Sequence, residues 1–382
     1  MRHVCAFGPH GGPVSVPFST HQCPTEQIAG RSKGVRRGSN LASAPPVTSV
    51  LIVDDEPAVR DIMARWVASL GLRSHTAGSA DEALATLRGQ QCELAVIDVT
   101  MPERDGIRLA HELQRAHPNT ALVLATTDAD LLDTGQAPLS FADLIVKPFQ
   151  RDRFELAVDR GRRWRKHWLE ELRWQAQLAV ELEDRIGELH ADMWTYTARG
   201  ASESAALMSI AQERIPRTAA HSERVARYAV SVAAELGLAP EASSVVESAA
   251  RFHDIGKAAM PLALLTKPSP LTPGEAAIMR KHVEVGADVL LATTQLAAVA
   301  PLVHASHESF DGTGYPDQLA GEDIPLESRI IAVCDSYDAM TQSRLYRRAT
   351  DSGDAVRELL RCSPSQFDPR IVDAFIAMLG RH

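Results

Sequence analysis

The C-terminal half of the chain contains side chains of the types that bind metal ions. The candidate ligands, in chain order, are His221, His253, Asp254, His282, His307 and Asp335. Imidazole and carboxylate groups together suit divalent transition metals such as iron, manganese or zinc. Two ions that share a carboxylate stand about 3.5–4 Å apart, an arrangement that catalyses displacement at phosphate esters. A lone histidine is more often structural, but this ordered set favours a metal-dependent phosphohydrolase.

The N-terminal half contains a second group of reactive types, dominated by carboxylates. Asp54 and Asp55 follow one short apolar run, and Asp98 follows another. Three carboxylates around one point are costly unless a hard cation neutralises them, and Mg²⁺ with oxygen ligands is the natural choice. Lys147 and Thr126 end two further apolar runs and offer a cation and a hydroxyl to an incoming phosphoryl group. This pattern predicts a phosphoacceptor pocket.

Short apolar runs place these polar residues at the ends of predicted strands. The runs are Val50–Val53, Leu94–Ile97, Ala121–Leu124 and Leu144–Val146. Helix-like segments lie between most of them, and this alternation is typical of a buried parallel sheet. We therefore expect residues 48–163 to form an α/β doubly wound domain with a five-stranded parallel sheet. In such sheets the site lies beyond the C-terminal ends of the strands.

This N-terminal region resembles the receiver domain of two-component response regulators. The resemblance rests on Val53–Glu56, Asp98–Gly106, Thr126 and Lys147–Phe149. It implies that Asp98 accepts a phosphoryl group from a cognate sensor histidine kinase. Asp54 and Asp55 would hold Mg²⁺ together with Asp98, and Thr126 and Lys147 would complete the pocket. A cis peptide bond before Pro148 is also expected.

Residues 164–202 have a different pattern, with leucines and other apolar residues spaced mostly by threes and fours among Glu and Arg. The spacing predicts a long amphipathic linker helix. Gln175 interrupts the apolar seam. Two interpretations stay open: a coiled coil that supports a homodimer through the receiver and linker, or a single helix packed on a domain.

No strand pattern stands out in residues 203–382, which we expect to form an all-α domain. The predicted helices are 219–236, 241–256, 273–291, 295–309, 326–341, 353–361 and 369–379. Gly237, Pro273 and Pro369 stand at helix boundaries, where glycine and proline are expected.

The helical region resembles the HD-GYP branch of the HD phosphohydrolase superfamily, from Thr218 to Phe375. The matching motifs are His253–Lys257, Leu271–Glu275, His307–Pro316, Ile324–Leu326, Asp335–Thr341 and Arg344–Arg347. The resemblance implies a phosphodiesterase that hydrolyses cyclic di-GMP to linear pGpG, or further to GMP.

The same resemblance implies residue roles. Two iron or manganese ions would be held by His221, His253, Asp254, His282, His307 and Asp335, with Asp254 bridging. Lys257 would contact the scissile phosphate and act with His253 and Asp254 in catalysis. The dinucleotide would be held, by stacking or phosphate contacts and a tight loop, at Gly312, Gly314, Tyr315, Arg344 and Arg347.

Two positions depart from the family pattern. Ser306 stands where many members have the first of two adjacent histidines, and Arg217 stands where members with three metals have a glutamate. We therefore expect two ions rather than three. His304 lies about 200° around a predicted helix from Ser306 and should face away. A non-catalytic domain that senses cyclic di-GMP or binds a protein remains the alternative.

Charge, cysteine content and hydropathy exclude several other classes of protein. The net charge of −9 makes non-specific nucleic-acid binding unfavourable, and no basic recognition helix stands out, so no DNA-binding output is expected. The five cysteines are scattered and form no C-x-x-C pair, which favours free thiols in the cytoplasm. We expect no membrane span, and a disordered tail over the Gly-, Pro- and Ser-rich residues 1–47.

Overall fold

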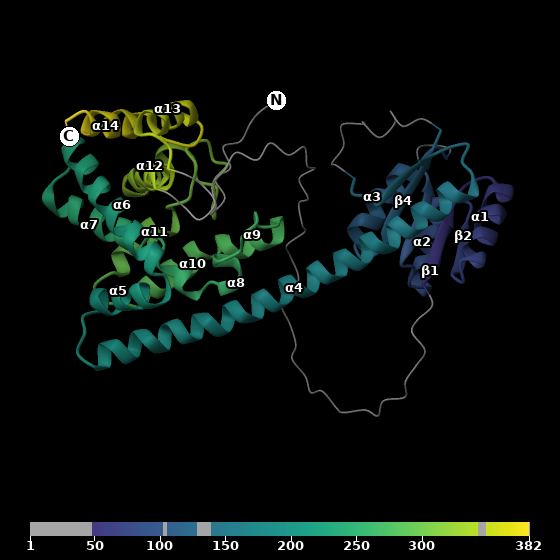
Figure 1. Ribbon diagram of the computed structural model, residues 1–382, viewed down its shortest axis with the longest axis horizontal. Coiled ribbons are helices and arrows are strands. Elements are labelled where there is room, and N and C mark those ends of the chain that lie inside the picture. Colours follow the sequence, from purple (N-terminus) through teal and green to yellow (C-terminus); the bar gives the residue numbers. More distant parts are fainter. Residues whose placement is uncertain (1–47, 102–104, 128–138, 343–348, 382) are drawn as a thin grey trace. The chain divides into compact units, whose positions relative to one another are not determined.

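The computed structural model of the protein describes residues 48–101, 105–127, 139–342 and 349–381 (Figure 1). The predicted disordered tail, residues 1–47, lies outside these residues. Within the described part the chain forms two compact units that divide between Trp174 and Gln175.

The first unit is built on the predicted parallel sheet. Its strands are β1 (Ser49–Val53), β2 (Arg73–Ala77), β3 (Leu94–Asp98), β4 (Ala121–Thr126) and β5 (Asp143–Val146). They run parallel in the order β2-β1-β3-β4-β5, which confirms the predicted five-stranded doubly wound fold. The apolar runs did not reveal β2, because this strand lies at an edge and is largely polar and partly exposed.

Helices cover both faces of this sheet, because successive strand side chains point to opposite sides. The helices are α1 (Pro57–Ser69), α2 (Ala80–Gly89), α3 (Asp105–Ala116) and the start of α4 (Arg151–Ala198). Leu51 and Val53 of β1 pack in one cluster with α2 and α3. Val50 and Ile52 of the same strand pack in another cluster with α1 and α4. Two-sided burial explains why the strand sequences are continuously apolar.

Helix α4 is a single unbroken helix of 48 residues, so the last helix of the receiver continues as the linker helix (Figure 1). In the first unit Phe154 is buried against the sheet. In the second unit Leu178, Leu182 and Leu189 are buried in the helical core. From Gln175 onward α4 therefore packs on the helical unit.

The second unit is helical throughout its described residues. After α4 its elements are α5 (Glu203–Arg214), α6 (Pro216–Glu235), α7 (Pro240–Phe252), η3 (Ile255–Ala259), α8 (Leu262–Leu265), α9 (Pro273–Arg280), α10 (His282–Leu291), η4 (Ala297–Val299), α11 (Ala300–His304), η5 (Gly321–Asp323), α12 (Leu326–Thr341), α13 (Ser352–Cys362) and α14 (Pro369–Leu379). This confirms the predicted all-helical domain. One apolar core runs through it.

Several predicted helix limits in this unit are wrong. The predicted helix 295–309 is a 3₁₀ turn followed by the short α11, which ends at His304. The predicted helix 241–256 ends at Phe252, where the chain turns into η3. The predicted helix 273–291 is two helices that meet at Lys281, and α5 was not predicted. These breaks bring side chains from separate elements to one point, as the site shows.

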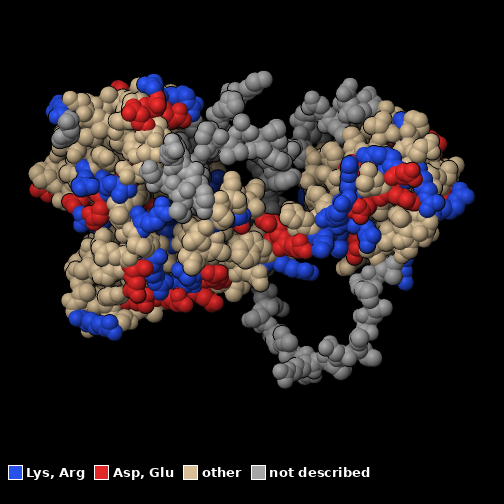
Figure 2. Space-filling model, in the orientation of Figure 1, with Lys and Arg blue, Asp and Glu red and all other residues tan. Residues whose placement is uncertain are grey.

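Two further features of the described residues are the hydropathy of the helices and the charge on one face of the helical unit. No helix among the described residues combines the length and the apolar character that crossing a bilayer requires. On the face of the helical unit drawn in Figure 2, basic and acidic residues are interspersed. That face therefore lacks an extended basic surface of the kind that nucleic acid favours.

The packing of α4 on the helical unit predicts unequal effects of two truncations. Leu182 of α4 is buried, and Leu291 of α10 is 58% exposed. Leu182→Ala should lower the free energy of unfolding of the helical unit by about 2–5 kcal/mol, because it leaves a cavity. The matched control Leu291→Ala should change it by less than about 0.5 kcal/mol. Urea unfolding with hydrogen exchange measured on peptides of this unit checks both, and equal effects would contradict the packing.

Candidate functional site

The acidic residues of the receiver meet at the C-terminal edge of its sheet. Carboxylate oxygens of Asp54, Asp55 and Asp98 lie within 4.8 Å of one another, which is a spacing that can hold a cation. Asp54 and Asp98 are buried, whereas Asp55 is exposed. Oxygen donors in this number suit a hard divalent ion.

Lys147 closes the pocket from β5. Its Nζ donates to Asp54 Oδ2 at 2.7 Å and to Asp98 Oδ2 at 2.6 Å. Burial would lower the pKa of Lys147, but the hydrogen bonds to these two carboxylates outweigh it and raise that pKa. The amine thus stays charged beside the carboxylate that the sequence singles out as phosphoacceptor.

The remaining pocket residues are also brought together. Thr126 is buried at the end of β4, and its carbonyl accepts a hydrogen bond from the Lys147 amide at 2.7 Å. The expected cis bond between Lys147 and Pro148 is present. Sequence reasoning missed Thr100, whose hydroxyl donates to Asp98 Oδ1 at 2.6 Å. Its signal was only its place two residues after Asp98.

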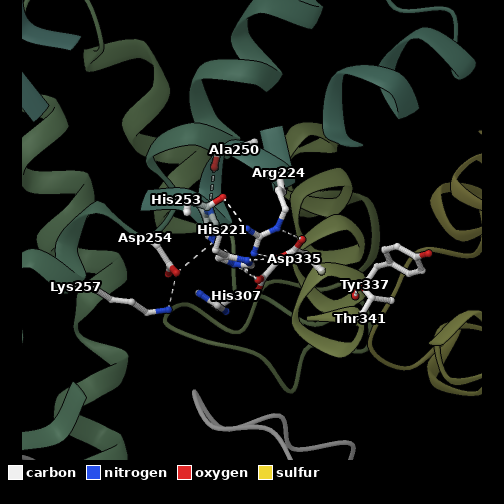
Figure 3. Close-up of polar contacts among 12 residues, drawn as sticks. His221, Arg224, Ala250, His253, Asp254, Lys257, His307, Asp335, Tyr337 and Thr341 are labelled. Atoms are coloured by element: carbon white, nitrogen blue, oxygen red, sulfur yellow. Dashed lines mark hydrogen bonds and ion pairs between the residues drawn. The ribbon is translucent and has the colours of Figure 1, made fainter. Parts of the chain in front are cut away.

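The helical unit brings all six predicted metal ligands to one centre. Figure 3 labels His221, His253, Asp254, His307 and Asp335 at this centre. Donor atoms of His221, His253 and Asp254 lie within 4.8 Å of one another, and so do those of Asp254, His282 and His307. Asp254 belongs to both groups. One shared carboxylate between two sets of ligands is the arrangement that a pair of ions requires.

Separate elements supply these ligands. His221 lies on α6, Asp335 on α12, and His282 opens α10, while His253 and Asp254 follow α7. The contact between η3 and α10 is close, because a Cβ on Gly256 would lie 2.0 Å from the His282 carbonyl oxygen. Only glycine permits this approach, which holds the His253–Asp254 pair next to His282.

Backbone carbonyls fix the tautomers of two histidines. His253 Nδ1–H donates to the Ala250 carbonyl and His282 Nδ1–H donates to the Met279 carbonyl, both at 2.8 Å. With the proton on Nδ1, each ring can present the lone pair of Nε2 to the centre. This is the usual way in which a protein orients metal-binding imidazoles.

The centre contains buried polar atoms without hydrogen-bond partners among the described residues. They are His253 Nε2 and Asp254 Oδ1, although His282 Nε2 lies 3.3 Å from the latter. His282 Nε2 also lies 3.1 Å from His307 Nε2. Orphaned acceptors are costly when buried. Because they are acceptors of the types that coordinate divalent ions, the residues present fit a metal centre.

Charge effects keep most of the ligands in the protonation state that a metal needs. Burial lowers the pKa of His253, and burial with repulsion from His282 lowers that of His307 to about 3. Burial alone would raise the pKa of Asp254, but Lys257 and the neighbouring histidines hold it well below its usual range. Lys257 Nζ donates to Asp254 Oδ2 at 2.6 Å. Neutral imidazoles and an ionised carboxylate are the ligating forms.

His221 lies between two carboxylates of α12. Its Nε2 is 2.9 Å from Asp335 Oδ1, and its Nδ1 is 2.5 Å from Asp338 Oδ2. Burial would lower the pKa of His221, but these two contacts outweigh it and raise that pKa to about 9. Without an ion the ring therefore holds a proton that a bound cation would displace.

Asp338 is a candidate site residue that sequence reasoning missed. It is fully buried, and besides His221 it binds the Arg224 guanidinium through two hydrogen bonds, at 2.7 and 2.8 Å. Its signal was its position one helical turn after Asp335, which puts both carboxylates on one face of α12. A carboxylate that fixes the outer nitrogen of a ligand histidine orients that histidine.

The loop after α11 lies against the centre. The Tyr315 ring is parallel to the His307 ring, with centroids 5.2 Å apart, and the Tyr315 amide donates to the His307 carbonyl. Gly312 has a φ of 81°, and a Cβ on Gly314 would lie 2.2 Å from the Ser309 nitrogen. The predicted tight loop is therefore present. The candidate substrate residues Arg344 and Arg347 lie outside the described residues.

The structure shows the surroundings of Ser306 and Arg217, the two positions that depart from the family pattern. The buried Ser306 hydroxyl donates to the Val303 carbonyl at 2.7 Å, and Arg217 is exposed on α6. His304 pairs with Asp317 at 3.1 Å and belongs to neither group of candidate ligands. The helical rotation used to predict that His304 faces away does not apply, because α11 ends at His304.

Comparison with known proteins agrees with this architecture. The response regulator receiver domain family matches residues 50–159, and the HD domain family matches residues 205–371. The cyclic di-GMP phosphodiesterase response regulator RpfG of Xanthomonas campestris pv. campestris is 33% identical over 91% of this chain and 92% of its own length. A cyclic di-GMP phosphodiesterase of Thermotoga maritima is 28% identical over 86% of this chain and 90% of its own length.

A third relative matches less than half of the chain. The 3′3′-cGAMP-specific phosphodiesterase 2 of Vibrio cholerae is 37% identical over 44% of this chain and 33% of its own length. A receiver fold followed by a helical domain with a His–Asp centre defines a response regulator whose output domain carries candidate metal ligands. The chain belongs to the family of response regulators that combine a receiver domain with an HD-GYP domain.

The contacts of Asp338 predict a loss of metal affinity in Asp338→Asn. The substitution keeps the side-chain shape but weakens the hold on His221, so affinity should fall about 10–100-fold. Competition with a chelator, followed by metal analysis, measures this. Asp288→Asn, at an exposed position on α10, is the matched control and should bind as the wild type does. Equal affinity in all three proteins would contradict the orienting role.

Proposed function

We propose that this response regulator is a metal-dependent phosphodiesterase that hydrolyses cyclic di-GMP to linear pGpG or GMP, under control of phosphorylation at Asp98. The observation that carries the proposal is the sharing of Asp254 by two groups of ligands. The substrate follows from the relatives that resemble the chain over most of its length, because both are named for cyclic di-GMP.

In this proposal the helical unit holds two divalent transition metals, iron or manganese. His221, His253 and Asp335 would serve one ion, His282 and His307 the other, and Asp254 both. The ions would supply an activated water and stabilise charge on the phosphate. Lys257 would place its amine at the scissile phosphate, because it already lies at the shared carboxylate. The loop with Gly312, Gly314 and Tyr315 would border the dinucleotide.

The receiver would take its phosphoryl group from a sensor histidine kinase. Asp54, Asp55 and Asp98 would hold Mg²⁺. The ion would neutralise the carboxylate charges while an Asp98 oxygen accepts the phosphoryl group. Lys147 and Thr126 would then bind the phosphoryl oxygens. Cys92 and Cys334 are buried free thiols, which supports our assignment to the reducing cytoplasm.

We propose that α4 carries the receiver state to the helical unit. Arg185 of α4 donates to the Ala258 carbonyl at 3.4 Å, and Ala258 follows Lys257 in η3. Arg185 Nε is buried without a hydrogen-bond partner, so this contact is only partly satisfied. A contact of that kind can be exchanged at small cost when α4 moves, and the move would reach Lys257.

The same helix supports our proposal of a homodimer. Trp194 is 73% exposed and Val180 is 64% exposed, more than any other large apolar residue among those described. Pairing of α4 helices from two chains would cover both side chains.

A cyclic di-GMP sensor without useful turnover is the second candidate. The observation that favours it is Ser306, which belongs to neither ligand group and whose hydroxyl donates a hydrogen bond to the Val303 carbonyl. With one imidazole fewer than many relatives, the centre would bind metal and dinucleotide without cleaving the latter.

A turnover assay separates the two candidates. The wild type, reconstituted anaerobically with Fe²⁺ or Mn²⁺, should convert cyclic di-GMP to pGpG or GMP on chromatography. Asp254→Asn should not, because it removes the shared ligand, whereas the control Asp288→Asn should. Binding without cleavage would favour the sensor, and cleavage of 3′3′-cGAMP alone would show that the substrate assignment is wrong.

The receiver should change both turnover and oligomeric state. Beryllofluoride, a phosphoryl mimic, should alter them in the wild type and leave Asp98→Asn unchanged. Arg185→Gln should reduce the response of turnover, because it removes the α4 contact with η3, whereas the control Arg199→Gln, just beyond α4, should respond fully. Turnover and light scattering provide the readouts. Identical behaviour of wild type and Asp98→Asn would contradict regulation by phosphorylation. A full response in Arg185→Gln would contradict transmission through the contact between α4 and η3.

A further inference from the structure

The substrate proposed above carries two phosphodiester anions, yet most described cations at the centre already have partners. Lys257 is bound to Asp254, and Arg224 is bound to Asp338. The whole chain is acidic, with a net charge of −9. Binding a dianion beside carboxylates therefore calls for a further cation whose donors are available.

Arg280 is placed to be that cation. It is the last residue of α9, two positions before the ligand His282, and it is exposed. Its guanidinium carbon lies over the Tyr315 ring, 5.1 Å from the centroid. The Tyr315 ring in turn is parallel to that of His307, 5.2 Å away. Two ring contacts thus connect this cation to the metal ligands.

The donors of Arg280 are available. Across the described part of the chain its guanidinium makes no ion pair and no hydrogen bond. A cation held over an aromatic ring is attracted through its flat side, which leaves the N–H groups at its edge directed elsewhere. Ring contact also restrains a long side chain before a ligand arrives, so less conformational entropy is lost on binding.

We propose that Arg280 binds the phosphodiester of the dinucleotide that is not cleaved, and that Tyr315 is the platform that orients Arg280. The inference rests on the function proposed above. Lys257 lies at Asp254 and serves the scissile group, whereas Arg280 reaches the centre only across the Tyr315 and His307 rings. A guanidinium that is separated from the metal ligands by two rings suits the phosphodiester that is not cleaved. It also reassigns Tyr315, which the sequence suggested as a direct contact to the dinucleotide.

The experiment compares Arg280→Met, which keeps the apolar contact with the ring, with Arg280→Lys, which keeps the charge. The control is Arg227→Met, at an exposed arginine of α6. Reconstituted proteins are assayed with cyclic di-GMP and with bis(p-nitrophenyl) phosphate, which has a single phosphodiester. Affinity is measured separately with a hydrolysis-resistant phosphorothioate analogue of cyclic di-GMP.

Arg280→Met should raise KM and Kd for the dinucleotide about ten-fold or more, the effect of losing a charge-assisted contact, with little change in kcat. Turnover of the small ester should be unchanged, and Arg280→Lys should recover part of the affinity. Unchanged KM and Kd in Arg280→Met, or equal losses on both substrates, would overturn the inference while the wild-type activity stands. A wild type that neither binds nor cleaves the dinucleotide would overturn the proposed function, and this inference with it.

Discussion

One buried carboxylate, Asp254, sets the conditions for the rest of the helical unit. A buried carboxylate is stable only with compensating charge and hydrogen bonds. Lys257 engages one of its oxygens, and the other lacks a hydrogen bond among the described residues. Two ions, one on each side, would satisfy it. The end of α7, the start of α10 and the loop after α11 all converge here, so the positions of these helices depend on how this charge is neutralised.

Hydrogen bonds orient the histidines around Asp254 for binding a cation. Backbone carbonyls take the Nδ1 protons of His253 and His282, while Asp338 takes that of His221. Each ring is therefore held in the orientation that points Nε2 inward, before any ion binds. Preparation of this kind lowers the cost of reorganisation on binding, but it leaves unsatisfied acceptors in a buried place. The apolar core that surrounds the centre supplies the stability that offsets this cost.

Much of this arrangement could be predicted from the sequence, because its strongest signals are local. Apolar runs that end in Asp54 or Asp98 mark strand ends, and the His253–Asp254 pair marks a ligand set. The breaks between α9 and α10, and within 295–309, could not be predicted, because tertiary contacts rather than propensity decide where those helices end. The only local signal of Asp338 was its spacing from Asp335, because its partners His221 and Arg224 lie on another helix. Arg280 contacts Tyr315, which is distant in sequence, so no local pattern distinguishes it from an ordinary surface charge.

Crystallography of the full chain, reconstituted with Mn²⁺ and recorded at the manganese absorption edge, tests the role of Asp254 most directly. The account predicts two anomalous peaks about 3.5–4 Å apart, each at coordination distance from an Asp254 oxygen. His221 and His253 should lie beside one peak, and His282 and His307 beside the other. A single peak, or two peaks of which only one contacts Asp254, would contradict the shared carboxylate.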